Sequence, residues 1–176
     1  MSQKPFSSYI TPPSQLTNFQ KVVEFNKAFG VKTNTTPQLD IFDKDPKFVE
    51  SRLALIQEEF NETVEAIKNK DFTEMADGLM DLIWVCYGMC TNLGIDADKC
   101  LEIVNQSNMS KLCESEDIAI ESVRRYKQEI PQRYDSPTYR KSDCGNYWVV
   151  YNTSSNKILK SYKYTPVSFT SLLTKK

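Results

Sequence analysis

The chain has 176 residues, of which 40% are hydrophobic and 26% charged, which is typical of one soluble globular domain, or one domain with an appendage. It contains no histidine, which excludes Ser-His-Asp and Cys-His catalysis and zinc sites that use histidine. The net charge of −1 hides a separation: residues 46–120 hold 15 acids and 6 bases, and residues 121–176 hold 4 acids and 11 bases.

The N-terminal half predicts an arm followed by two helices. Residues 1–14 are rich in Pro and Ser and should form an irregular arm. Apolar residues at helical spacing predict a first helix from about Gln15 to Phe29, followed by a polar loop over residues 31–45. Asp45 and Pro46 supply a cap and a first-turn proline, so a second helix should run from Pro46 to about Asn69.

Three further helices and a β-hairpin complete the prediction. Helices are expected from Asp71 to about Leu93, from Asp96 to about Leu112 and from Ser115 to Glu129. The aromatic and β-branched stretches YWVVY and KILKSYKY flank the turn-forming NTSSN and predict a small β-hairpin. The expected fold is all-α: a bundle of about five helices over residues 15–130, with a basic β-hairpin extension over residues 131–176.

Acidic residues cluster on the second and third predicted helices. Glu58, Glu59 and Glu62 lie in IQEEFNET, and Glu74 and Asp77 lie in FTEMADGLMD. Acids three or four residues apart share a helix face and repel each other unless a cation lies between them. Because oxygen ligands suit Mg²⁺, which usually binds together with phosphate, these clusters predict a magnesium site.

An ordinary structural role competes with this interpretation for some acids. Glu74 is at the N3 position after the Asp71 cap and could simply stabilise the start of its helix. Asp77 and Asp81 are harder to explain in that way, because they lie four residues apart on a largely apolar helix, where unpaired carboxylates are costly. Bound metal would remove that cost and could include Asp81.

The acidic residues resemble the signature of the MazG-like, all-α nucleoside triphosphate pyrophosphohydrolases, in which EExxE is followed after a spacer by ExxD. Here the two parts are Glu58-Glu59-Phe-Asn-Glu62 and Glu74-Met-Ala-Asp77. The stretches FNKAFG, RLALIQEE, YGMCTNLGID and VNQSNMSKLC are similar to the phosphoribosyl-ATP pyrophosphohydrolase-like branch. The resemblance covers about residues 16–115 and implies a MazG-like helical bundle.

The resemblance also implies an activity: hydrolysis of a nucleoside triphosphate to the monophosphate and pyrophosphate, with two or three Mg²⁺ per site, for which Mn²⁺ may substitute. Glu59, Glu62, Glu74 and Asp77 would bind metal, with Asp81 beside them, and Glu58 would orient or deprotonate the attacking water. The expected assembly is a homodimer or homotetramer.

Candidate substrate contacts lie outside the acidic motif. The resemblance assigns Asn108 and Lys111 to the nucleotide, although Lys111 also suits a helix C-terminus. Arg52 could reach a phosphate or pair with a surface acid. Asn26, together with Phe25, Phe29, Trp84 and Tyr87, could contact the base, although aromatic residues at helical spacing more often pack in a core.

Two alternative functions remain open: phosphoribosyl-ATP pyrophosphatase of histidine biosynthesis, and a non-catalytic nucleic-acid-binding module that uses the basic, tyrosine-rich C-terminal part. We expect no nucleic-acid partner under the main interpretation. The five cysteines form no CxxC pair, and no targeting or membrane-spanning segment is evident. The sequence therefore predicts a cytoplasmic protein without disulfides.

Overall fold

The computed structural model describes residues 15–173, so the arm expected at residues 1–14 lies outside the described residues. The described chain forms helices and one small three-stranded sheet, which confirms the expected all-α fold with a small β appendage. The described chain divides into two compact units, described separately below: unit 1, with residues 15–100 and 170–173, and unit 2, with residues 101–169.

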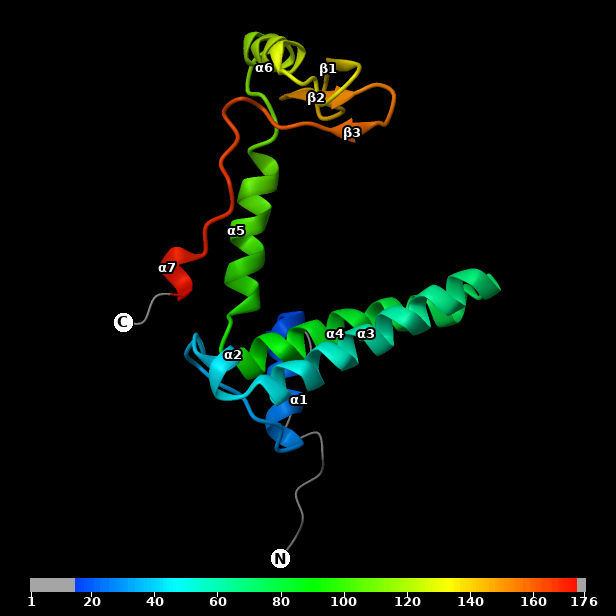
Figure 1. The fold of residues 1–176 in the computed structure, drawn as a ribbon, viewed down its shortest axis with the longest axis vertical. Helices are drawn as coiled ribbons and strands as arrows, with labels where there is room; N and C mark the ends of the chain where they lie inside the picture. The colour runs from blue at the N-terminus through cyan, green and yellow to red at the C-terminus, as the bar shows by residue number, and fades with distance from the viewer. Residues whose placement is uncertain (1–14, 174–176) are drawn as a thin grey trace, which may run out of the picture. The chain divides into compact units, whose positions relative to one another are not determined.

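A pair of long antiparallel helices is the main feature of unit 1. Helix α3 (Pro46–Asn69) and helix α4 (Phe72–Leu93) lie side by side along their lengths (Figure 1). Asp45 accepts a hydrogen bond from Phe48 N at the start of α3, and Asp71 accepts from Thr73 N and Glu74 N at the start of α4. Both expected caps are therefore confirmed, and the two helices have the expected boundaries.

Helix α1 (Asn18–Ala28) packs against α4 and starts later than expected. Thr17 and Gln20 form a capping box: Thr17 Oγ1 accepts from Gln20 N at 3.1 Å, and Thr17 N donates to Gln20 Oε1 at 3.0 Å. This reciprocal pair fixes the first helical residue at Asn18. The loop that follows contains the short helix α2 (Ile41–Lys44), which the sequence interpretation had left as part of the polar loop.

The loop after α1 is fastened to the end of α4. Asn34 N donates to Thr91 O and Gln38 N donates to Leu93 O, each at 2.9 Å. Gly94 caps α4 in the left-handed conformation, with φ 70°. A Cβ at this position would lie 2.0 Å from Thr36 O, so the close approach of this loop requires glycine.

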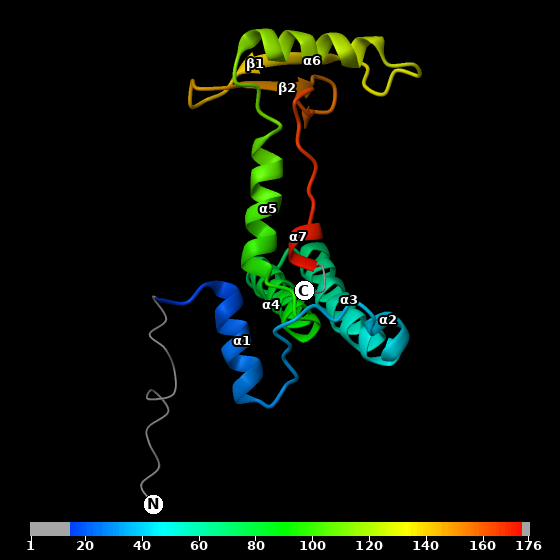
Figure 2. The same cartoon turned by 90° about the vertical axis from the view of Figure 1, so that its left-hand side faces the viewer.

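Unit 2 contains most of helix α5 (Ala97–Met109), a second helix and the sheet. Helix α6 (Glu116–Gln128) covers one face of the sheet formed by β1 (Pro137–Lys141), β2 (Trp148–Asn152) and β3 (Lys157–Ile158) (Figure 2). The sheet is antiparallel throughout, in the order β1-β2-β3. Its core comprises Cys113, Ala119, Val123, Val150 and Leu159.

The expected domain boundary differs from this division. The sequence interpretation placed α6 in the helical domain and began the extension at residue 131, whereas α6 belongs to the same compact unit as the sheet. The physical reason is that Ala119 and Val123 of α6 supply one side of the core that Val150 closes from β2. Strand β1, which the expected hairpin omitted, pairs with β2 from Pro137↔Asn152 to Lys141↔Trp148.

The last described helix is α7 (Thr170–Leu173). All five cysteines are free thiols. Across residues 15–173 no single helix has both the length and the apolarity needed to span a membrane; α4 and α5 reach those values only as a bent pair, judged by length and composition.

Candidate active site

The six candidate metal ligands and water-activating residues lie on the antiparallel pair α3 and α4. One close contact sets the register of the two helices. A Cβ built on Gly78 would lie 2.7 Å from Thr63 Oγ1 and 3.3 Å from Thr63 Cα, so these two residues mark the closest approach. Both are buried.

This register brings acids of the two motifs together. The two helices are antiparallel, so a residue just before Thr63 in α3 lies beside a residue just after Gly78 in α4. Glu62 is therefore level with a point between Asp77 and Asp81 of α4. By the same argument Glu59 lies almost level with Asp81. Glu59 and Glu62 therefore lie at the level of Asp77 and Asp81 on the neighbouring helix.

The electrostatic environment of Glu59 includes the charges of acids from both helices. Its pKa is raised above the usual value, first because burial disfavours its charged form, and then because of the negative charges of Asp81, Glu62, Glu58 and Asp77, in decreasing order. Glu59 is half-buried, whereas the other five acids are exposed. A cation bound among these groups would relieve their mutual repulsion.

The donor set fits Mg²⁺ as an open site. Among residues 15–173 no three Asp, Glu, Cys or His side chains lie close enough together to form a ready-made cage for an ion. Mg²⁺ does not require such a cage, because it keeps several waters and binds through one or two carboxylates plus substrate phosphates. Carboxylates on two facing helices, without nitrogen or sulfur donors among them, match that chemistry.

Glu74 keeps both of the roles considered for it. Its backbone N–H donates to Asp71 Oδ1 at 3.1 Å, so it occupies the N3 position of the α4 cap. Its side chain is exposed and lies nearer the α3–α4 turn than Asp77 does. Glu74 is not among the charges that act on the pKa of Glu59, which places it at the edge of the carboxylate group.

Asn26 and Arg52 have contacts of their own in unit 1. Asn26 is buried, and its Nδ2 donates to Thr91 Oγ1 at 2.5 Å, which ties α1 to α4. The Arg52 guanidinium lies 5.4 Å from the centre of the Phe48 ring, and its Nε is buried without a hydrogen-bond partner in the described part of the chain. The contact made by Asn26 is structural, and the Nε of Arg52 is a buried donor that no described residue satisfies.

The aromatic residues of α1 and α4 form an exposed cluster. Phe25 stacks on Phe29 with a ring-centre distance of 4.3 Å and meets Trp84 edge-on at 5.3 Å. Phe29 is 71% exposed, so these rings are not core residues of the single chain. The expectation that they more often pack in a core does not hold for Phe29.

Asn108 and Lys111 belong to unit 2. Lys111 Nζ donates to Asn108 Oδ1 at 2.7 Å. Sequence reasoning missed the residues that hold this segment: Ser107 Oγ donates to Thr165 O at 2.8 Å, and Ser110 Oγ accepts from Thr165 N at 2.9 Å. The only signal in the sequence was the serine on each side of Asn108, which is too common to identify such contacts.

An antiparallel helix pair with EExxE on one helix and ExxD on the next defines the class of MazG-like helical NTP pyrophosphohydrolases. Within that class, residues 22–108 match the model of the phosphoribosyl-ATP pyrophosphohydrolase family, and this part of the chain belongs to that family. The expected superfamily is therefore confirmed. The domain is that of a nucleotide pyrophosphohydrolase.

A viral protein is similar over nearly the whole chain. Uncharacterized protein L479 of Acanthamoeba polyphaga mimivirus is 27% identical over 246 residues, covering 93% of this chain and 98% of the viral protein. Since the family match ends at residue 108, this similarity extends well beyond it, into unit 2.

Proposed function

We propose that this protein is a Mg²⁺-dependent nucleotide pyrophosphohydrolase that cleaves a (deoxy)nucleoside triphosphate to the monophosphate and pyrophosphate, with Mn²⁺ as a possible substitute. Its role would be control or sanitation of the nucleotide pool. One observation carries the proposal: the register set by Thr63 and Gly78 puts Glu59 and Glu62 at the level of Asp77 and Asp81 on the neighbouring helix. The family match supports pyrophosphate chemistry.

The residues of the two helices divide into two roles. Glu59, Glu62, Glu74 and Asp77, with Asp81 beside them, would hold Mg²⁺, which supplies positive charge to offset the triphosphate and polarise its phosphoryl oxygens. Glu58 lies one helical turn before Glu62 and is exposed, so it is available to a water molecule.

The reaction needs one base and one leaving group. A water oxygen bonds to the α-phosphorus while the bond from that phosphorus to the α–β bridging oxygen breaks. Pyrophosphate leaves with the electron pair, and the proton of the water passes to Glu58. In a protein without histidine a carboxylate is a natural base for this step.

Cationic and amide groups would bind the substrate. We assign a phosphate to Lys111 and the sugar or base to Asn108, as the resemblance implies. Arg52 is a further candidate for a phosphate, through the terminal nitrogens of its guanidinium. Asn26, committed to Thr91, would act by keeping α1 against α4.

The test is pyrophosphate release from a panel of ribo- and deoxyribonucleoside triphosphates with Mg²⁺. Glu62→Gln and Asp77→Asn should each lower kcat/KM by at least about 100-fold, because each removes a ligand charge while leaving the shape of the side chain almost unchanged. Glu65→Gln is the matched control, since Glu65 is an exposed acid of α3 outside the motif that pairs with Lys68 at 3.4 Å.

Two controls separate loss of catalysis from loss of folding and identify the product released. Unchanged far-ultraviolet circular dichroism must accompany the loss in Glu62→Gln and Asp77→Asn. Release of orthophosphate in place of pyrophosphate, or full activity of both variants, would contradict the mechanism.

A second substrate is favoured by the description of the matched family. Phosphoribosyl-ATP carries the same triphosphate-type bond and belongs in the panel. A kcat/KM for phosphoribosyl-ATP well above that for every simple triphosphate would assign the chain to histidine biosynthesis instead.

A further inference from the structure

Unit 2 contains a cleft that the proposed chemistry does not use. Its volume is about 390 Å³, which is within the range of about 300–1,000 Å³ typical of small-molecule sites. It is lined by residues from the end of α5, the start of α6, the β1–β2 connection and the segment after β3: Met109, Ser110, Leu112, Glu114, Ile118, Tyr147, Ser161, Lys163 and Thr165.

Hydrogen bonds fix the walls of this cleft. Ser107 Oγ donates to Thr165 O at 2.8 Å, and Ser110 Oγ accepts from Thr165 N at 2.9 Å, which joins the segment after β3 to the end of α5. On another wall, Tyr147 N donates to Ser142 Oγ at 3.1 Å, and Ser142 N donates to Tyr147 O at 2.9 Å. The cleft is therefore a built feature and not a gap between loose loops.

The lining combines a flat apolar surface with a few polar groups. Met109 is 54% exposed and Tyr147 38% exposed, so both present free surface to a ligand. Lys163 supplies a positive charge and Glu114 a hydrogen-bond acceptor at the same cleft. A ligand that suits this lining has a planar ring, N–H groups on the ring edge and an anionic group.

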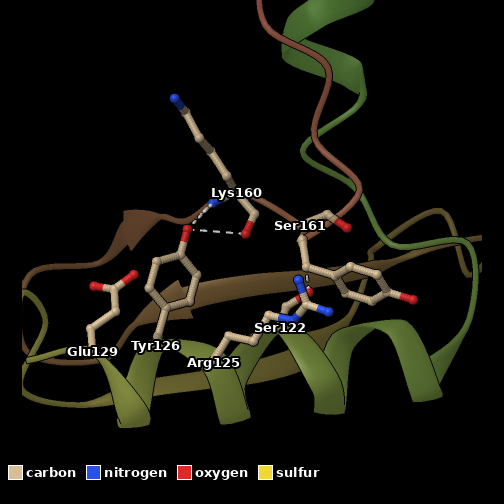
Figure 3. A pocket seen from close by; sticks show the side chains of 7 residues that line it. Ser122, Arg125, Tyr126, Glu129, Lys160 and Ser161 are labelled. Carbon is tan, nitrogen blue, oxygen red and sulfur yellow. Dashed lines mark hydrogen bonds between the residues drawn. The ribbon is translucent and has the colours of Figure 1, made fainter.

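A second, smaller pocket in unit 2 is less suited to a ligand, because several of its polar groups already bond to other residues of the protein. This pocket, of about 160 Å³, is shown in Figure 3. Tyr126 Oη accepts from Lys160 N and donates to Lys160 O, both at 3.1 Å. The Arg125 guanidinium lies 4.3 Å from the centre of the Tyr162 ring and pairs with Glu121 at 2.8 Å. These contacts join α6 to the segment after β3.

The same contacts weaken the alternative of a nucleic-acid-binding surface. Side-chain cations of the protein already lie over several rings on which a base would have to stack. Arg125 Cζ is 4.3 Å from the centre of the Tyr162 ring, and Lys160 Nζ is 4.2 Å from the centre of the Tyr164 ring. Tyr147, in contrast, lines the larger cleft.

We propose that this cleft in unit 2 binds a nucleoside monophosphate, with the base against Tyr147 and Met109, a base N–H donating to Glu114, and the phosphate at Lys163. The choice of a nucleotide rests on the proposed function, because a nucleoside monophosphate is the product of that reaction. The cleft itself rests only on the geometry of unit 2.

The test is calorimetric titration of the full-length protein with AMP, GMP, CMP and UMP in EDTA, so that metal at the carboxylates does not contribute. Lys163→Ala should weaken binding at least about tenfold because it removes the positive charge at the phosphate, and Tyr147→Ala should do so because it removes the ring on which the base stacks. Lys157→Ala is the matched control, because Lys157 lies on β3 outside the cleft, 5.6 Å from the centre of the Tyr134 ring.

The possible outcomes separate this inference from the proposed function. Binding of monophosphates by a protein that releases no pyrophosphate from any triphosphate would support the cleft and contradict the enzyme. An active enzyme that binds none of the four monophosphates at millimolar concentration would overturn the cleft. So would affinities unchanged in both variants, or inorganic phosphate binding as tightly as the nucleotides.

Discussion

Glu59 shows how a single residue can report on a whole site. Its half-buried carboxyl group has four other carboxylates near enough to raise its pKa, and they come from both helices. In a protein without a bound cation this arrangement is unfavourable. The same arrangement becomes favourable when Mg²⁺ and a triphosphate are present, which is what an enzyme that binds both together needs.

Asp135 has the opposite electrostatic environment and gives a prediction for pH. Hydrogen bonds from Ser154, Asn152 and Ser136 lower the pKa of Asp135 to about 2, from 3.8. A lowered folded-state pKa stabilises the protein above the unfolded-state value, and this contribution is lost as the pH falls from 3.8 toward 2.

We therefore expect the melting temperature to fall on acidification from pH 5 to pH 2, and to fall less in Asp135→Asn, which cannot titrate. Thermal unfolding across that range measures the difference. Asp143→Asn is the control, because Asp143 lies after β1, pairs with Arg140 of that strand and takes no part in the hydrogen bonds around Asp135. An identical pH profile for Asp135→Asn and the unsubstituted protein would contradict the assignment.

At this scale the sequence predicted the charged residues better than the buried polar ones. The spacing of Glu59 and Glu62, and of Asp77 and Asp81, was sufficient to predict two shared helix faces, because a helix turns spacing directly into position around its axis. Their role as metal ligands stays a prediction. The burial of Asn26 could not be predicted in the same way. Its partner Thr91 is 65 residues away in the chain, and only the packing of α1 on α4 brings them together.

The α3–α4 pair depends on a glycine in the middle of α4, and two glycines of that helix allow a matched test. A side chain at Gly78 would meet Thr63, whereas nothing lies within 4 Å of a Cβ at Gly88. Gly78→Ala should destabilise the protein by about 1–3 kcal/mol, the usual cost of overpacking, and lower pyrophosphohydrolase activity by separating the acids. Gly88→Ala should be neutral or stabilising by up to about 1 kcal/mol, because alanine favours a helix.

Urea unfolding curves for the two variants give both free energies. Equal stability of the two variants would contradict the close contact at Gly78, because alanine would then stabilise the helix at both positions.

The sequence predicted element boundaries well where it contains clear capping residues, and poorly elsewhere. Asp45-Pro46, Asp71 and Gly94 gave α3 and α4 their expected ends, because caps and left-handed glycines are local signals. Strand β1 was missed because its sequence, PTYRK, contains a proline and two charges and gains its strand character only from pairing with β2. Helix α5 ends at Met109, before Leu112, in the segment where Ser107 and Ser110 bond to Thr165.

At the scale of the whole molecule, the helix pair exposes many large apolar side chains. Leu53 is 60% exposed, Met80 59% and Phe72 77%, and further apolar side chains of α3 and α4 are exposed around them. Soluble monomers rarely expose contiguous apolar patches of such extent. We propose that copies of this chain cover one another along α3 and α4 in a homodimer or homotetramer.

Light scattering after size exclusion should give two or four times the chain mass of 20.3 kDa at micromolar concentration. Leu53→Glu or Met80→Glu should shift the protein toward the monomer, because each places a charge in the buried interface. Lys47→Glu, at the exposed start of α3, should leave the mass unchanged. A monomeric mass for the unsubstituted protein would contradict the proposed assembly.

The Thr63–Gly78 contact has a practical meaning for engineering. The hydroxyl of Thr63 meets Gly78 and also donates to the carbonyl oxygen of Glu59 at 2.8 Å. The gap between the two rows of acids is thus controlled by a pair of uncharged residues that perform no chemistry. Substitutions at these two positions could widen or narrow that gap, and so adjust which cation and which phosphate chain fit, while every carboxylate remains in the sequence.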